Sequence, residues 1–250
     1  MGTDSLKLAL QRQELVQTDG YHIWESKQKH VEIPTNEAAL LVCDVWDNHW
    51  CRGARERLNA MVTRMNQVVQ ASRANGLQII HAPSGTMEYY DDTPSRQRIL
   101  KITPVLPPEN LEHPDPPLPI DDSDQGSDTG EASPVAAWRQ QHGSIEIDHQ
   151  CDVISDDGRE VYSLLKNRGI DKLLIMGVHT NMCVLERSFA IKQMVRWGIH
   201  VALIRDLTDT MYNPAMPPYV DHAEGTKLVI GYIEKFWCPT IESQELLNPA

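Results

Sequence analysis

Short apolar runs and stretches of helical periodicity alternate along most of this chain. The runs suit strands that are covered on both faces, and they span residues 38–44, 77–82, 173–178 and 199–206. Apolar residues recur at helical spacing in residues 58–72, 159–167, 184–195 and 229–236. A short alternating segment, 144–148, predicts one further strand. This order predicts an α/β fold with a doubly wound, mainly parallel sheet and helices on both faces, in three layers.

Two segments lie outside this pattern. Residues 1–37 form a polar leader with sparse apolar anchors, which we expect to pack over the edge of the domain. Residues 83–143 hold most of the prolines, so they are too proline-rich for regular elements and too long for a simple connection. We interpret them as an insertion across the mouth of the sheet, a lid or an oligomer contact. The prediction is one domain over residues 1–250, with this leader and this insertion.

An acidic run at residues 121–131 lies within the insertion. Its segment DDSDQGSD resembles a calcium loop, but Gly126 stands where the third ligand of an EF-hand is required. We therefore favour a solvated acidic loop over a calcium site.

Composition narrows the classes of function. The net charge is -12, and an acidic surface repels both nucleic acid and anionic membranes. Five widely spaced cysteines without a C-x-x-C pair indicate a reducing compartment rather than a disulfide framework. The N-terminal residues are too polar for a signal peptide, and no apolar stretch reaches membrane-spanning length. These features predict a cytoplasmic protein with no nucleic-acid or membrane partner.

Cys183 occupies the turn between the apolar run 173–178 and the helical stretch that follows it. Thr180 or Asn181 can cap that helix, which places the thiol near unpaired backbone N–H groups. The positive end of a helix favours the thiolate, the nucleophilic form of cysteine. A small buried hydrophobic residue is the alternative role for Cys183, since most free cysteines are of that kind.

Asp44 ends the first apolar run, so we expect it at the carboxyl edge of the sheet with Cys183. A carboxylate there could accept the thiol proton, as an activated cysteine requires. Two loops at the same edge carry candidate pocket walls, for which ordinary packing is the alternative. These candidates are Trp46, His49, Tyr212 and Asn213.

The segments LLVCDVWDNHWC and GVHTNMCV resemble the isochorismatase-like cysteine hydrolases, a superfamily that includes nicotinamidase and N-carbamoylsarcosine amidohydrolase. The resemblance covers residues 38–82 and 144–236. It implies that Asp44 is the general base and Cys183 the nucleophile. It also implies an oxyanion hole formed by the backbone N–H groups of His179 and Cys183, and a cis peptide bond between Val178 and His179.

The catalytic lysine of that family is missing. In the family it follows the third strand, and the corresponding stretch, IEIDHQCDVISDDGREV, contains no lysine. His149 or Gln150 takes the position, and His149 could supply part of the missing charge as a cation whereas glutamine could not. Lys101, in the insertion, is a weaker alternative.

The resemblance implies hydrolysis of a C–N bond, of amide or carbamoyl type, in a small molecule through a thioester on Cys183. A non-catalytic binder or scaffold is the alternative, because the lysine is absent. A metal-dependent amidase using His49 or His81 is a third possibility, but the histidines show no ligand spacing, so we predict no metal and no other cofactor. The family also implies a homo-oligomer.

Overall fold

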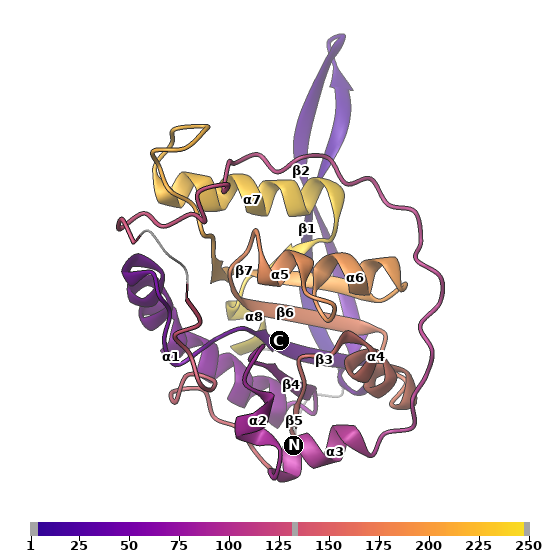
Figure 1. The fold of residues 1–250 in the computed structure, drawn as a ribbon. Helices are drawn as coiled ribbons and strands as arrows, with labels where there is room; N and C mark the ends of the chain where they lie inside the picture. Colours follow the sequence, from indigo (N-terminus) through magenta and orange to yellow (C-terminus); the bar gives the residue numbers. More distant parts are fainter. Residues whose placement is uncertain (1–4, 132–134, 248–250) are drawn as a thin grey trace.

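An eight-stranded mixed sheet forms the centre of the computed structural model, which describes residues 5–131 and 135–247 (Figure 1). The strand order is β2-β1-β8-β7-β6-β3-β4-β5. The strands are β1 Ser5–Thr18, β2 Tyr21–Pro34, β3 Ala38–Cys43, β4 Gln78–Ala82, β5 Val153–Ile154, β6 Lys172–Val178, β7 His200–Asp209 and β8 Thr240–Ile241. From β8 to β5 all neighbours are parallel, as the alternation of strands and helices predicts.

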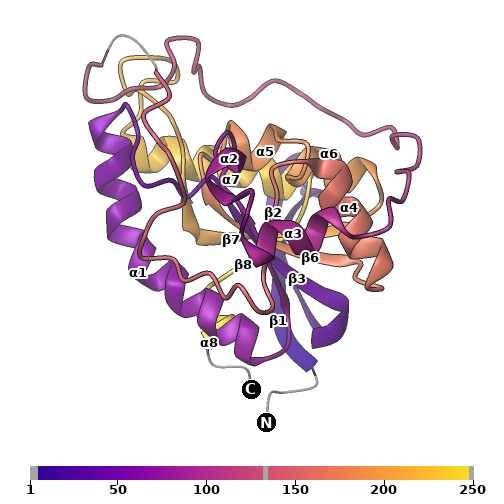
Figure 2. The same cartoon turned by 60° about the horizontal axis from the view of Figure 1, so that its bottom comes forward.

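Helices cover both faces of this sheet (Figure 2). Alternate residues of each strand point to opposite faces, so Leu41 belongs to the hydrophobic cluster on one face and its neighbour Leu40 to the cluster on the other. The three-layer prediction is confirmed. The helices are η1 Thr35–Glu37, α1 Arg52–Ala74, α2 Met87–Tyr90, α3 Pro94–Leu100, α4 Gly158–Asn167, α5 Cys183–Glu186, α6 Ile191–Arg196, α7 His222–Phe236 and α8 Gln244–Leu247.

The leader is a long β-hairpin, which the sequence pattern did not predict. Strands β1 and β2 pair along their whole length, and β1 joins the sheet through Gln11 beside Thr240 of β8. Asp19 and Gly20 form the turn, both at positive φ (51° and 85°). An Asp-Gly pair between two strand-like runs is a strong hairpin signal, so the turn of this element is encoded locally.

The predicted strand at residues 144–148 is wrong. These residues form the end of a turn, a bend and an irregular stretch, and the edge strand is β5, five residues further on. The apparent alternation has another cause: Ile145 packs into the core, while Glu146 binds Arg73 of α1. A single buried side chain between polar ones gives the same pattern as a strand.

The helix predicted after Cys183 is two short helices, α5 and α6. The break lies at residues 187–190, where Ser188 accepts a hydrogen bond from the backbone N–H of Gly158 at 3.0 Å. A Cβ at position 158 would overlap the backbone of Ser188. The close approach of α4 therefore depends on a glycine at its first residue.

The insertion contains α2 and α3, so it is not wholly irregular. From α3 it runs as a long trace around the side of the molecule carrying α6 and α7 before it returns towards α1 (Figure 1). Its middle is tied to α6, because the backbone N–H of Leu111 donates to the carbonyl of Arg196. Its first residues, through Ser84, and its second half both reach the carboxyl edge of the sheet.

Candidate active site

Asp44 and Cys183 follow adjacent strands. Strand β3 pairs directly with β6, and Cys43 lies opposite Gly177. Gly177 has a φ of 134°, and a Cβ there would overlap the carbonyl of Cys43. A glycine thus lets the two strand ends approach closely. The structure brings the predicted pair together at this edge, within hydrogen-bonding reach.

The Asp44 carboxylate is fully buried and held from three sides. One oxygen accepts the backbone N–H of Ser84 at 2.7 Å, and the other lies 3.1 Å from Nε of Arg187. The Cys183 side chain lies on the third side and favours the ionised carboxylate. The φ of Asp44 is 50°, a left-handed conformation that aspartate tolerates better than most side chains.

Burial decides the protonation of this pair. It raises the pKa of Asp44, against the opposing effects of the Arg187 charge and the Cys183 hydrogen bond. Burial, with the neighbouring Asp44 charge, raises the pKa of Cys183 to about 12. The expected thiolate-favouring environment is therefore not found, since the resting sulfur is a thiol. A neighbouring base has to remove its proton before it can attack.

The helix end contributes little to that sulfur. Met182, and neither Thr180 nor Asn181, is the N-cap of α5, and it makes no side-chain cap hydrogen bond. Thr180 instead binds the hydroxyl of Thr208, and the Asn181 side chain binds the backbone of Met211. Helix α5 has four residues, too few for a strong dipole.

The backbone of His179 faces the sulfur. The peptide bond between Val178 and His179 is cis, as the family resemblance implied. A backbone hydrogen bond from His179 to Cys183 lowers the cysteine pKa slightly against burial. The His179 ring is buried and lies edge-on to His49, with 4.8 Å between ring centroids. Burial lowers the pKa of His179 to about 3 and that of His49 to about 4, so both rings are neutral at pH 7.

Arg187 is the cation of this site, and the sequence reasoning missed it. Its charge acts on both Asp44 and Cys183, favouring the ionised form of each. The signal was its place on the chain, four residues after Cys183, where a helical turn returns a side chain to the same side.

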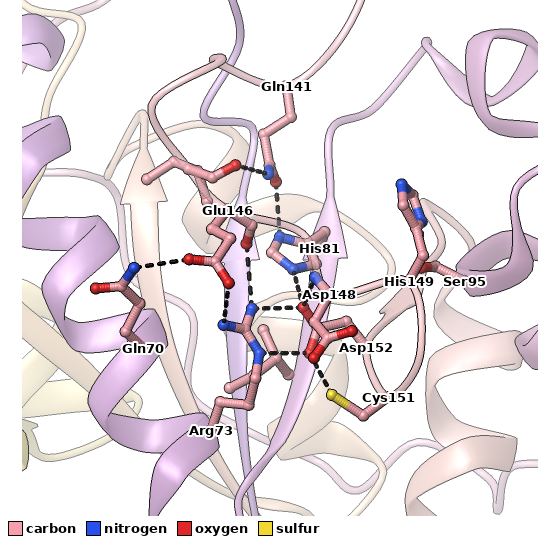
Figure 3. A network of polar contacts seen from close by, with 12 residues as sticks. Gln70, Arg73, His81, Ser95, Gln141, Glu146, Asp148, His149, Cys151 and Asp152 are labelled. Atoms are coloured by element: carbon pink, nitrogen blue, oxygen red, sulfur yellow. Dashed lines mark hydrogen bonds and ion pairs between the residues drawn. The ribbon is translucent and has the colours of Figure 1, made fainter.

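His149, which was predicted to replace the lysine, does not lie beside Asp44 and Cys183. It is exposed, and its ring nitrogen lies 2.7 Å from the hydroxyl of Ser95 in α3 (Figure 3). Among the described residues, no contact joins it to Asp44 or Cys183. The carbonyl groups of His149 and Gln150 accept hydrogen bonds from Arg98, so this loop is held against α3. Lys101, exposed at the end of α3, also makes no contact with the pair in the described part of the chain.

Trp46 and His49 belong to an aromatic wall that the insertion completes. The Trp46 ring stacks on Trp138 at 4.0 Å and donates to the Ser84 carbonyl, while His49 stacks on the same tryptophan at 5.7 Å. Since Ser84 also binds Asp44, this wall adjoins the candidate site.

The other two candidate wall residues lie elsewhere. Tyr212 is fully buried, and its hydroxyl donates to the carbonyl of Met216. Asn213 binds Asp124 of the insertion. None of the four predicted wall residues, Trp46 and His49 included, lines the Cys183 cavity.

A cavity of about 480 Å³ opens beside Cys183. Its lining comes from the segment after β6 and from the insertion, which supplies Leu118 and Asp122. The other lining residues are Asn181, Met182, Cys183, Glu186 and Arg187.

The acidic run at 121–131 keeps its acids at least partly exposed, as a solvated loop does, and it is also docked on the framework. Its acids bind one after another along the edge of the sheet. Asp122 binds Asn181, Asp124 binds Asn213, Asp128 binds Arg57, and Glu131 binds the N–H of Arg52 at the start of α1. Hydrogen bonds, first from Thr129 and then from Ser127, lower the pKa of Glu131 to about 2. The run therefore fastens the insertion to the framework.

In the described part of the chain, no cluster of three or more histidine, cysteine or acidic side chains has the arrangement of a metal site. Both ring nitrogens of His81 are engaged, by Gln141 at 2.9 Å and Asp152 at 3.1 Å (Figure 3). His49 is packed among aromatic rings and accepts the N–H of Cys51. His49 and His81, the candidate ligands of a metal-dependent amidase, thus have protein groups as partners.

The sequence profile of the isochorismatase domain matches residues 38–215. The match covers most of the chain, including both strand ends that carry Asp44 and Cys183. The chain therefore belongs to the isochorismatase-like cysteine hydrolase superfamily, a class of hydrolytic enzymes.

Solved structures show the same fold at low sequence identity. A cysteine hydrolase from Pseudomonas syringae pv. phaseolicola 1448A is 16% identical, with a TM-score of 0.54, over 86% of this chain and 92% of the other. A putative isochorismatase from Burkholderia xenovorans LB400 is 15% identical, with a TM-score of 0.50, over 84% and 86%. No curated protein matches. Across the described residues, no helix is both long and apolar enough to cross a membrane.

Proposed function

We propose that this protein hydrolyses a C–N bond, of amide or carbamoyl type, in a small molecule through a thioester on Cys183. One observation carries the proposal: the buried Asp44 carboxylate and the Cys183 side chain lie together at the ends of adjacent strands, beside an open cavity. Groups with perturbed pKa values that meet at a cavity are typical of catalytic sites.

Asp44 takes the proton of Cys183, and the sulfur attacks the carbonyl carbon. The backbone N–H groups of His179 and Cys183 stabilise the resulting oxyanion. Protonated Asp44 then gives its proton to the departing nitrogen, and ammonia or an amine leaves. Water, with Asp44 again as base, hydrolyses the thioester to a carboxylic acid and restores the thiol.

Arg187 supplies the positive charge beside the base and the nucleophile that a lysine supplies in the family. A guanidinium keeps its charge at any pH the protein survives, and it holds Asp44 through Nε. It stabilises the ionised forms of the base and of the nucleophile while the proton moves between them.

The test is a panel of small primary amides and carbamoyl compounds, with ammonia release as the readout. A thioester trapped by acid quench should appear in the intact mass and map to Cys183. Cys183→Ser should abolish both signals. If neither the panel nor the trap gives a signal, and Cys183 also resists iodoacetamide at neutral pH, the protein is instead a non-catalytic binder or scaffold.

Three further parts of the proposal concern organisation. We propose one domain over residues 1–250, a homo-oligomeric assembly and a cytoplasmic location. Light scattering coupled to size exclusion tests the assembly, and limited proteolysis tests the single domain, since the hairpin and the insertion should resist cleavage until the whole chain unfolds.

A further inference from the structure

The cavity at Cys183 carries an excess of negative charge. The charges of Asp44, Cys183 and Arg187 sum to zero, and the sum does not change when the proton passes from the sulfur to the carboxylate. Glu186 is paired with Lys192 at 2.5 Å. Asp122 is the one lining carboxylate in the described residues that has no cationic partner.

Asp122 is held in place by a neutral group. One of its oxygens accepts the side-chain N–H of Asn181 at 2.7 Å. Asn181 is almost fully buried and also donates to the carbonyl of Met211 while accepting its N–H. The anchor is therefore rigid, and it leaves the charge of Asp122 uncompensated. Its second oxygen makes no hydrogen bond within the described part of the chain.

We infer that this carboxylate selects substrates that carry a cationic nitrogen, such as an ammonium group, a few bonds from the scissile carbonyl. The inference rests on the proposed function and names the substrate class of the same site. A fixed negative charge favours a cationic partner and repels substrates that bear a carboxylate. Leu118 and Met182 can pack against the short aliphatic chain between the two groups.

Three amides of matched size test the inference. 4-Aminobutanamide carries a cation, pentanamide is neutral and succinamate carries an anion. We expect kcat/KM for ammonia release to fall in that order, with about tenfold between cation and neutral amide, as for one partly solvated charge pair. Asp122→Asn keeps the size and the bond to Asn181, and it should remove the preference. Asp122→Lys should reverse it in favour of succinamate.

Asp121→Asn is the matched control. It removes one negative charge from the neighbouring residue, which caps the N–H of Ser123 and does not line the cavity. The order of the three amides should be unchanged in this variant. Loss of the order in both variants would mean that the overall charge of the loop acts, and not Asp122.

A second measurement separates this inference from the proposed function. Alkylation of Cys183 by 2-bromoethylammonium, bromoacetamide and bromoacetate forms a carbon–sulfur bond and releases bromide, with the thiol proton passing to Asp44. Asp122→Asn should slow only the cationic reagent and accelerate only the anionic one. Equal changes for all three reagents overturn the inference alone. No reaction with bromoacetamide overturns the proposed function, and the inference with it.

Discussion

Two buried aspartates of this protein, Asp44 and Asp152, have similar surroundings and opposite electrostatics. Each lies beside an arginine and a third titratable side chain, Cys183 for Asp44 and His81 for Asp152. Asp152 has five hydrogen-bond donors: two from Arg73, at 2.6 and 3.0 Å, one from His81, the backbone N–H of Asp148 and the Cys151 thiol at 3.5 Å (Figure 3).

The count of donors sets the direction of each pKa. Burial alone would raise the pKa of Asp152, but His81 and Arg73 outweigh it and hold that pKa far below the usual range. At Asp44 burial prevails, because Arg187 reaches it through a single nitrogen. A saturated carboxylate stabilises structure, whereas an incompletely saturated one can accept a proton.

The largest expected effect is on reactivity. Asp44→Asn removes the base while keeping the size of the side chain, so alkylation of Cys183 by iodoacetamide at pH 7 should slow about a thousandfold. Mass spectrometry of the modified peptide measures the rate. An unchanged rate would show that Asp44 is not the base.

Asp152→Asn should lower the stability of the protein and leave the reactivity of Cys183 unchanged. The substitution leaves Arg73 and His81 without their carboxylate, so the free energy of unfolding should fall by about 3 kcal/mol. Urea denaturation measures it. The folded fraction should alkylate at Cys183 as fast as the wild type, and a slower reaction would mean that the two networks are coupled.

The same comparison can be made between the arginines that pair with the two aspartates, Arg187 with Asp44 and Arg73 with Asp152. Arg187→Met should slow alkylation of Cys183 about tenfold, because the ionised forms of base and nucleophile lose a neighbouring charge. Arg187→Lys should recover part of the rate. Arg73→Met should leave the rate unchanged and lower the stability, and rate loss in that variant would contradict the assignment of roles.

We expect the smallest effect in the pH dependence of the free energy of unfolding. Asp44 and Asp152 should change it in opposite directions. The folded pKa of Asp152 lies below its unfolded value of about 3.9, so its stabilisation is present above that pH and is lost as the pH falls. The folded pKa of Asp44 lies above that value, so stability declines as the pH rises through the window between the two.

Urea titrations of both asparagine variants between pH 3 and pH 7 measure these slopes. Relative to the wild type, Asp44→Asn should gain stability as the pH rises, while the deficit of Asp152→Asn should shrink as the pH falls. Parallel slopes would show that the two carboxylates do not differ in the way the structure indicates.

The order of strands and helices determined most of the framework. Period and run length are local properties of the sequence, and at the centre of the sheet, as in residues 38–44 and 173–178, they agree with the tertiary packing. The same rule failed at residues 144–148, where one buried isoleucine imitates a strand. It also failed at the leader, where the hairpin signal lies in the turn residues Asp19 and Gly20 and not in the apolar period.

The sequence also identified Asp44 and Cys183, because both follow buried strands and parallel strands end at the same edge. The spacing of Arg187 from Cys183 is a local signal for that part of their surroundings. Only the tertiary structure decided the rest, since the position of Asp122 depends on how a long insertion returns to the sheet. Burial, a property of the folded chain, reversed the expected state of the thiol. Charge and solvent exposure at a site arise from segments far apart in the sequence, so no local pattern encodes them.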